Sequence, residues 1–124
     1  MPTQRLPNSY PKRGEVYIAN LDPGFGKEIH KKRPVLVISA NILNQQAFSV
    51  VIIPFSSIVP QLLTPDMVKV PQLEGLEKNS VILVDKIRAI DKERLVKKIG
   101  TISKEKLLEV EDSLKFVLDL AEAN

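Results

Sequence analysis

An arginine and a glutamate stand in a charged segment that leads directly into an apolar run. Residues 26–33 read Gly-Lys-Glu-Ile-His-Lys-Lys-Arg, and the run Val35–Ile38 follows Pro34. An unbroken apolar and β-branched run predicts a strand that is buried on both faces. Pro34 suits the first position of such a strand and favours extended backbone at Arg33. We therefore expect Arg33 and Glu28 on a loop at the mouth of a rigid scaffold, where functional groups are frequent. A solvated loop before a core strand would explain the same residues equally well.

Two hydroxyl groups, on Ser56 and Ser57, follow a second apolar run that ends at Pro54. If residues 35–38 and 50–53 pair as antiparallel strands, the start of one lies beside the end of the other, and Arg33 lies next to Ser56. An arginine fork and a hydroxyl donor suit the binding and charge stabilisation of a phosphate. Serines after a strand are also common turn residues, and the lysines of the charged segment are often solubility charges. The residues alone therefore predict an anion site at most.

The elements that must position these groups are about six short strands followed by one helix. Seven segments are candidates for these strands, namely residues 15–21, 35–39, 48–53, 67–70, 80–84, 87–90 and 96–102. Apolar residues at three- and four-residue spacing, such as Leu107, Val110 and Leu114, predict a helix over residues 104–122, with Ser103 as its cap. Residues 1–12, interrupted by three prolines, are expected to form a flexible arm. This order predicts one domain of 124 residues, a small and mostly antiparallel barrel or rolled sheet closed by a C-terminal helix.

Composition limits the chemistry. The chain has no cysteine, which excludes disulfides and thiolate metal sites, and its single histidine, His30, excludes a two-histidine ribonuclease site within one chain. The carboxylates show no metal-ligand spacing, so we expect no metal and no cofactor. The net charge of +3 permits binding to nucleic acid without requiring it. No apolar run is long enough to cross a bilayer and no secretory signal is visible, which favours the cytoplasm.

Short motifs spread along nearly the whole chain are similar to those of one protein family. They are Arg13-Gly14-Glu15-Val16-Tyr17, Leu21-Asp22-Pro23, Gly26-Lys27-Glu28, Arg33-Pro34-Val35-Leu36-Val37-Ile38, Pro54-Phe55-Ser56-Ser57, Ser80-Val81-Ile82-Leu83, Ile87-Arg88-Ala89-Ile90-Asp91, Arg94-Leu95 and Lys98-Ile99-Gly100. Each motif alone is weak, but their order and spacing together are specific. The chain resembles the MazF/PemK/Kid-type toxins of bacterial toxin–antitoxin pairs.

The resemblance implies an SH3-like, partly open antiparallel barrel with a C-terminal helix, assembled as a homodimer. It also implies a sequence-specific, metal-independent endoribonuclease that cleaves single-stranded RNA, chiefly mRNA, and is neutralised by a cognate MazE-like antitoxin. The 2′-hydroxyl of the RNA attacks the adjacent phosphate, so the protein supplies proton transfer and charge stabilisation only.

The resemblance also assigns the site residues. Arg33 matches the catalytic arginine, as acid–base partner and stabiliser of the phosphorane, and Ser56 stands where many members have a threonine that contacts the phosphate. Glu28 matches a glutamate that positions RNA or assists proton transfer. The residues expected to bind RNA are Lys27, Ile29, Lys31, Lys32, Ser57, Lys86 and Arg88. Lys27, Ile29 and Lys86 replace the serine, glutamine and glutamine that are frequent there, which puts base specificity in doubt more than the chemistry.

Two alternatives remain from the sequence. The same fold is used by CcdB-like toxins, which poison DNA gyrase, and that function would make the Arg33 loop structural. A catalytically inactive member that only binds its antitoxin or RNA is the other. The presence of Arg33 together with the Ser56 hydroxyl favours the nuclease.

Overall fold

The two apolar runs of the sequence form the neighbouring central strands of one sheet. The computed structural model describes residues 9–71, 76 and 78–121. Strand β2 (Lys32–Val37) pairs antiparallel with β3 (Ser49–Ser56), with Leu36 opposite Ile53. Leu36 and Ile53 belong to one buried cluster, whereas Val35 and Ile52 belong to another. The successive side chains of Val35–Val37 therefore enter different cores, which confirms that this part of the strand is buried on both faces.

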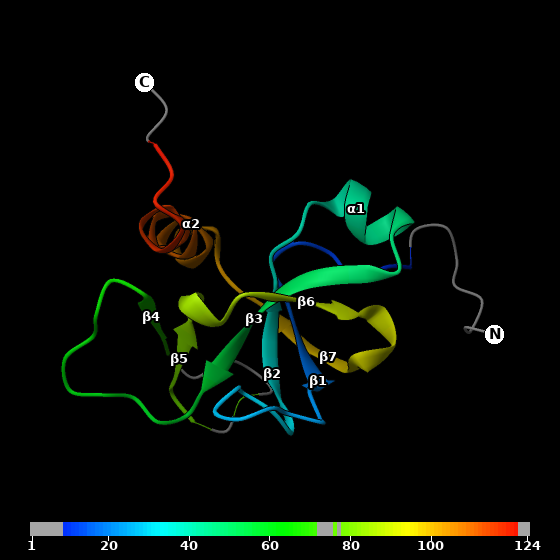
Figure 1. The fold of residues 1–124 in the computed structure, drawn as a ribbon. Helices are drawn as coiled ribbons and strands as arrows, with labels where there is room; N and C mark the ends of the chain where they lie inside the picture. Colours follow the sequence, from blue (N-terminus) through cyan, green and yellow to red (C-terminus); the bar gives the residue numbers. More distant parts are fainter. Residues whose placement is uncertain (1–8, 72–75, 77, 122–124) are drawn as a thin grey trace.

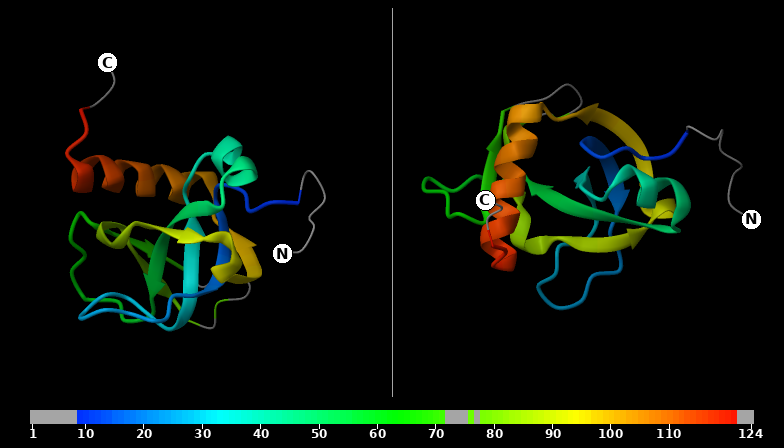
Figure 2. Two further views of the ribbon diagram at one scale, coloured as in Figure 1. Left: turned by 45° about the vertical axis from the view of Figure 1, so that its right-hand side comes forward. Right: turned by 90° about the horizontal axis from the view of Figure 1, so that it is seen from above.

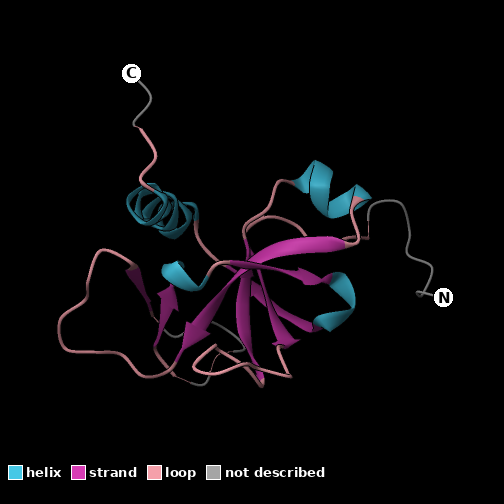
Figure 3. Cartoon of the chain, in the orientation of Figure 1, coloured by secondary structure: helices cyan, strands magenta, loops and turns pink. Residues whose placement is uncertain are grey.

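Seven strands form the sheet in the order β4-β5-β3-β2-β1-β7, and β6 pairs with the first half of β3. The further strands are β1 (Glu15–Asn20), β4 (Met67–Val70), β5 (Ser80–Leu83), β6 (Arg88–Asp91) and β7 (Leu95–Thr101). All of their pairings are antiparallel. The strands curl around the core with the helices outside, and β4 and β7 stand at the two ends of the order (Figures 1 and 3). The partly open antiparallel barrel with a C-terminal helix is confirmed.

Helix α2 (Lys104–Leu118) packs against β4 and a short 3₁₀ turn, η1 (Val84–Lys86). The Ser103 hydroxyl accepts a hydrogen bond from the Lys106 N–H (3.1 Å), as a capping serine does. The helix ends before the predicted residue 122. Asp119 adopts a left-handed conformation, and the Leu120 N–H bonds back to the Lys115 carbonyl (2.9 Å), which is the Schellman pattern that terminates helices.

Two strand boundaries differ from the prediction in ways that matter for the site. Pro54 does not end β3, because the strand changes partner there: Phe55 and Ser56 pair with β5. Arg33 is part of β2, opposite Ala19 of β1, rather than on the preceding loop. The backbone of Arg33 is therefore held in the sheet.

The shorter elements complete the description. Asn41–Gln46 forms the one-turn helix α1, and Lys92–Arg94 forms a 3₁₀ turn, η2, capped by the Asp91 carboxylate. Of the expected N-terminal arm, residues 1–8 lie outside the described residues, whereas Pro11 is buried against the body of the protein. In the part of the chain that the structure describes, no helix combines the length and the apolar composition that a membrane crossing requires.

Candidate functional site

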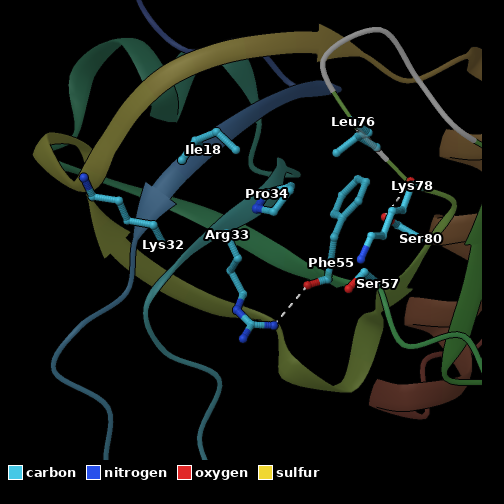
Figure 4. Close-up of a pocket in the computed structure, with 9 residues that line it drawn as sticks. All are labelled: Ile18, Lys32, Arg33, Pro34, Phe55, Ser57, Leu76, Lys78 and Ser80. Carbon is cyan, nitrogen blue, oxygen red and sulfur yellow. Dashed lines mark hydrogen bonds between the residues drawn. The ribbon is translucent and has the colours of Figure 1, made fainter.

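The side chain of Arg33 is held in place at both sides of its guanidinium. Nε donates to the His30 carbonyl (3.1 Å). Nη1 donates to the Phe55 carbonyl (3.4 Å), a bond that Figure 4 shows as a dashed line. A guanidinium has five N–H donors in one plane, so two bonds orient the group and leave donors for an anion. Arg33 is thus a half-buried, preoriented cation near the start of β2.

Arg33 lines a hollow of about 460 Å³, here named the Arg33 hollow. Its walls combine cations, hydroxyls and apolar surface, and consist of Ile18, Lys32, Arg33, Pro34, Phe55, Ser57, Leu76, Lys78 and Ser80. In Figure 4, Arg33 comes from one side, while Ser57, Lys78 and Ser80 come from the opposite side. Three cations and two hydroxyls around one cavity suit a phosphate group.

Arg33 contacts the end of β3, as predicted, but it contacts the backbone carbonyl of Phe55 rather than the Ser56 hydroxyl. The antiparallel register of β2 and β3 brings Arg33 to the Phe55 carbonyl, one residue before Ser56. The Ser56 hydroxyl accepts a hydrogen bond from the Ile58 N–H (3.1 Å), which leaves its own hydrogen as a donor. Ser57 is exposed and lines the Arg33 hollow directly.

The predicted residues Lys27, Glu28, Ile29, Lys86 and Arg88 gather around a second hollow of about 480 Å³, together with Ile87. We call it the Lys86 hollow. Glu28 therefore lies in a different hollow from Arg33, and its Oε1 already accepts the Phe25 N–H (3.0 Å). Lys31, with φ of 70°, lines neither hollow. The structure thus places Lys32, Arg33 and Ser57 at the Arg33 hollow and the other five at the Lys86 hollow, whereas Ser56 and Lys31 line neither.

A set of polar contacts at the base of the β1–β2 loop positions the arginine, and sequence reasoning missed it. Arg94 donates to the carbonyls of Asn20 (3.0 Å) and Asp22 (2.6 Å). The Asp22 carboxylate accepts the Lys31 N–H (2.8 Å) and contacts His30 Nδ1 (3.2 Å). The Lys31 N–H, followed by His30, lowers the pKa of Asp22. Since the His30 carbonyl receives Arg33 Nε, these contacts fix the segment that orients Arg33.

The sequence around each of the missed residues, Asp22, Arg94 and Lys78, suggests a different local structure. Asp22 lies in an Asp-Pro-Gly sequence, which reads as a turn, and nothing in its neighbourhood points to a partner distant in the chain. Arg94 looks like part of a short charged turn. Lys78 enters the Arg33 hollow only because its segment folds back beside β3. Asp22 and Arg94 lie in family motifs, but no local pattern assigns these roles to them or to Lys78.

No group of three or more histidine, aspartate or glutamate side chains comes together as a metal site among the described residues. The Arg33 hollow offers fixed cations and hydroxyls that can surround an anion. Such groups can bind a phosphodiester and stabilise charge that develops on it.

Comparison with known proteins agrees with this geometry and with the motifs. The chain matches the model of the PemK-like, MazF-like toxins of type II toxin–antitoxin systems over residues 12–118. It is 36% identical over 110 residues to the endoribonuclease EndoA of Bacillus subtilis, covering 88% of this chain and 95% of that relative.

Solved structures support the same assignment. MazF of Deinococcus radiodurans superposes with a TM-score of 0.79 at 26% identity, covering 90% of this chain and 99% of that one. A MazE–MazF complex from the same organism superposes with a TM-score of 0.74 at 26% identity, covering 90% and 97%. Since the matched family model spans both hollows and every strand, the chain belongs to the PemK-like, MazF-like toxin family of type II toxin–antitoxin systems.

Proposed function

We propose that this chain is a sequence-specific, metal-independent endoribonuclease that cleaves single-stranded RNA, chiefly mRNA. The observation that carries the proposal is the preoriented Arg33, fixed by two carbonyls at the wall of a hollow that it shares with Lys32, Lys78 and Ser57. The relative EndoA is an endoribonuclease by name, and together with the family match it favours the nuclease over a CcdB-like gyrase poison.

The reaction uses the nucleophile that RNA itself provides. The 2′-oxygen forms a bond to the adjacent phosphorus while the bond from phosphorus to the 5′-oxygen breaks. One proton is transferred overall from the 2′-oxygen to the leaving 5′-oxygen, through solvent or a side chain of the site, which yields a cyclic phosphate and a 5′-hydroxyl. The protein needs no covalent intermediate.

Arg33 stabilises the negative charge of the pentacoordinate phosphorane, with the Ser56 hydroxyl as a second donor. The planar set of N–H donors on a guanidinium suits charge stabilisation, so we place the main contribution of Arg33 there rather than in accepting the proton. Glu28 positions RNA or assists proton transfer, as the resemblance implies, from the Lys86 hollow. Lys27, Ile29, Lys31, Lys32, Ser57, Lys86 and Arg88 are proposed to bind the RNA.

The biological setting is part of the same proposal. The chain acts as one domain in the cytoplasm, assembles as a homodimer, and is neutralised by a cognate MazE-like antitoxin. The MazE–MazF complex among the structural neighbours supports the antitoxin as partner. No cofactor is required.

Cleavage of a long single-stranded RNA in excess EDTA, followed by end-group analysis, tests the activity. We expect wild type to cut at a few recurring sites with 5′-hydroxyl ends. Arg33→Ala should lower kcat by about 100-fold or more, because one preorganised charge-stabilising donor is commonly worth that much. Arg13→Ala is the matched control, since Arg13 lies at the opposite end of β1 and β2, where it pairs with Glu111.

No cutting by folded, dimeric wild type would contradict the proposal, and supercoiling by gyrase would then be assayed. Equal activity of Arg33→Ala and Arg13→Ala would remove Arg33 from the reaction while leaving the nuclease in place. Binding of RNA without cleavage would identify an inactive member.

Inhibition by the antitoxin makes a second prediction. An acidic segment that folds on binding competes for the basic RNA surface, so we expect it to cover Arg33. Hydrogen–deuterium exchange around residues 30–33, measured with and without antitoxin, should show protection that parallels the loss of cleavage. A complex that leaves this segment unprotected while cleavage continues would count against it.

A further inference from the structure

One aromatic side chain stands in solvent within the most charged part of the molecule. Phe25 is 83% exposed, on the loop that joins β1 to β2. This loop projects away from the barrel when the molecule is seen from above (Figure 2, right). Its sequence neighbours are glycines and then Lys27, so Phe25 has no apolar companion along the chain. A large apolar group in that position contributes nothing to the core.

The loop that holds Phe25 is nevertheless built to a defined shape. The Phe25 N–H donates to Glu28 Oε1 (3.0 Å), and the Glu28 N–H donates to the Phe25 carbonyl (3.1 Å). Gly24 packs so closely on the His30 side chain that a β-carbon at Gly24 would collide with it. Gly26 has a positive φ of 60°, which suits a residue without a β-carbon. The backbone at Phe25 is thus fixed from both sides.

Glu28 connects Phe25 to the Lys86 hollow, because the same glutamate lines that hollow. The hollow has apolar surface from Ile29 and Ile87 and cations from Lys27, Lys86 and Arg88. Apolar or aromatic surface beside cations is the combination that binds single-stranded nucleic acid: bases stack, and phosphates pair with the cations. A docking surface for an apolar protein segment would instead need contiguous apolar residues.

We propose that Phe25 is a stacking platform for one unpaired base of the RNA, held in position by Glu28, while the cations of the Lys86 hollow bind the phosphates next to that base. This inference rests on the proposed function and adds an RNA-binding contact to it. Stacking is tolerant of base identity, so Phe25 supplies affinity and register, and the hydrogen-bonding groups around it discriminate between bases.

The chain has no tryptophan, so Phe25→Trp creates a single fluorescent reporter at the proposed platform. The matched control is Phe48→Trp, because Phe48 is 85% exposed but precedes β3 at the end remote from Ser56. Each variant is titrated with a short RNA made uncleavable by 2′-O-methylation, and with an abasic oligomer of the same length. We expect the RNA to quench Phe25→Trp, the abasic oligomer to leave it nearly unchanged, and neither to affect Phe48→Trp.

Cleavage kinetics provide the second measurement. Phe25→Leu keeps an apolar side chain but removes the ring, and it should raise KM roughly 5- to 150-fold at nearly constant kcat, the range expected for one base–aromatic stack. Phe48→Leu should match wild type. Both side chains are exposed, so equal urea midpoints for the variants and wild type would establish that folding is intact.

The outcomes separate this inference from the proposed function. Quenching in a protein that cleaves no RNA would support the platform and refute the nuclease. Normal cleavage by Phe25→Leu, or equal quenching by RNA and the abasic oligomer, would refute the platform and leave the nuclease standing. Loss of antitoxin binding by Phe25→Leu with unchanged KM for RNA would also refute it, in favour of a protein contact.

Discussion

At the scale of single residues, the site depends on side chains whose direction is set by backbone carbonyls. Arg33 donates to the carbonyls of His30 and Phe55, which come from a loop and from the neighbouring strand. A free arginine side chain loses considerable rotamer entropy when it binds an anion. Here part of that entropy is already lost in the folded protein, so a phosphate meets a donor that is already oriented.

Glu28 offers a test of positioning against proton transfer. Its Oε1 accepts the Phe25 N–H, and a glutamine side chain keeps an oxygen acceptor at that place but cannot exchange a proton as a carboxylate does. If Glu28 acts by holding the loop, Glu28→Gln should cleave RNA within about 3-fold of wild type, whereas Glu28→Ala should lose roughly 10-fold or more, chiefly in KM. Single-turnover and steady-state cleavage rates separate the two. A loss of kcat in Glu28→Gln as large as in Glu28→Ala would assign proton transfer to the carboxylate.

At the scale of elements, a charged cluster around Glu15 links β1 to its partner strand β7. Lys98 Nζ on β7 lies 2.7 Å from Glu15 Oε2 on β1, and Glu15 Oε1 also accepts the Lys12 N–H (2.7 Å) and the Tyr17 hydroxyl (3.0 Å). Burial by itself raises the pKa of Glu15, but the bond from Lys98 and the other two donors outweigh it, so the pKa is lowered from its ordinary 4.5.

A lowered pKa in the folded state makes the contribution of Glu15 depend on pH in one direction. The ionised carboxylate stabilises the fold above the ordinary value of 4.5, and this stabilisation is lost as the pH falls through the lower folded pKa. Glu15→Gln should therefore be less stable than wild type by on the order of 1 kcal/mol at neutral pH, with the difference shrinking in acid. Urea unfolding at several pH values between about 7 and 3 measures this. A difference that stays constant down to the lowest pH would contradict it.

At the scale of the whole molecule, the net charge of +3 understates the charge near the site. The two hollows together are lined by Lys27, Lys32, Arg33, Lys78, Lys86 and Arg88, with Glu28 as the one carboxylate among these linings. A cationic surface of this kind attracts RNA over distances comparable with the Debye length and releases counterions when RNA binds.

Counterion release predicts the salt dependence of RNA binding. Each phosphate contact on a single strand contributes about 0.7 to the slope of log K against log salt. Lys27→Gln and Lys86→Gln should each reduce the slope by about that amount, measured with the 2′-O-methylated RNA. Lys104→Gln, at the start of α2 on a different part of the surface, should leave the slope unchanged. Equal slopes for all three variants would show that the RNA phosphates do not contact the Lys86 hollow.

The sequence by itself determined the order of the strands and the helix, but not all of their ends, and it predicted the meeting of Arg33 with the end of β3. These features follow from local signals. An apolar run such as Val35–Ile38 favours a strand that is buried on both faces. When two such strands pair antiparallel, the start of one lies beside the end of the other. The family motifs lie mostly in the same local segments. The residues themselves pointed to Arg33 and Ser57 as site candidates, and the family resemblance added Lys86.

Only the tertiary structure decided how those candidates are divided. Glu28 and Arg33 are close in sequence but line different hollows, because the β1–β2 loop folds back on itself through the Phe25–Glu28 bonds. The base of that loop is held by Arg94, which bonds to the Asp22 carbonyl across 72 positions of the chain. Loop conformation depends on such long-range hydrogen bonds, whereas strand and helix formation depends on the periodicity of neighbouring side chains, and for that physical reason the local pattern predicted the scaffold but not the shape of the site.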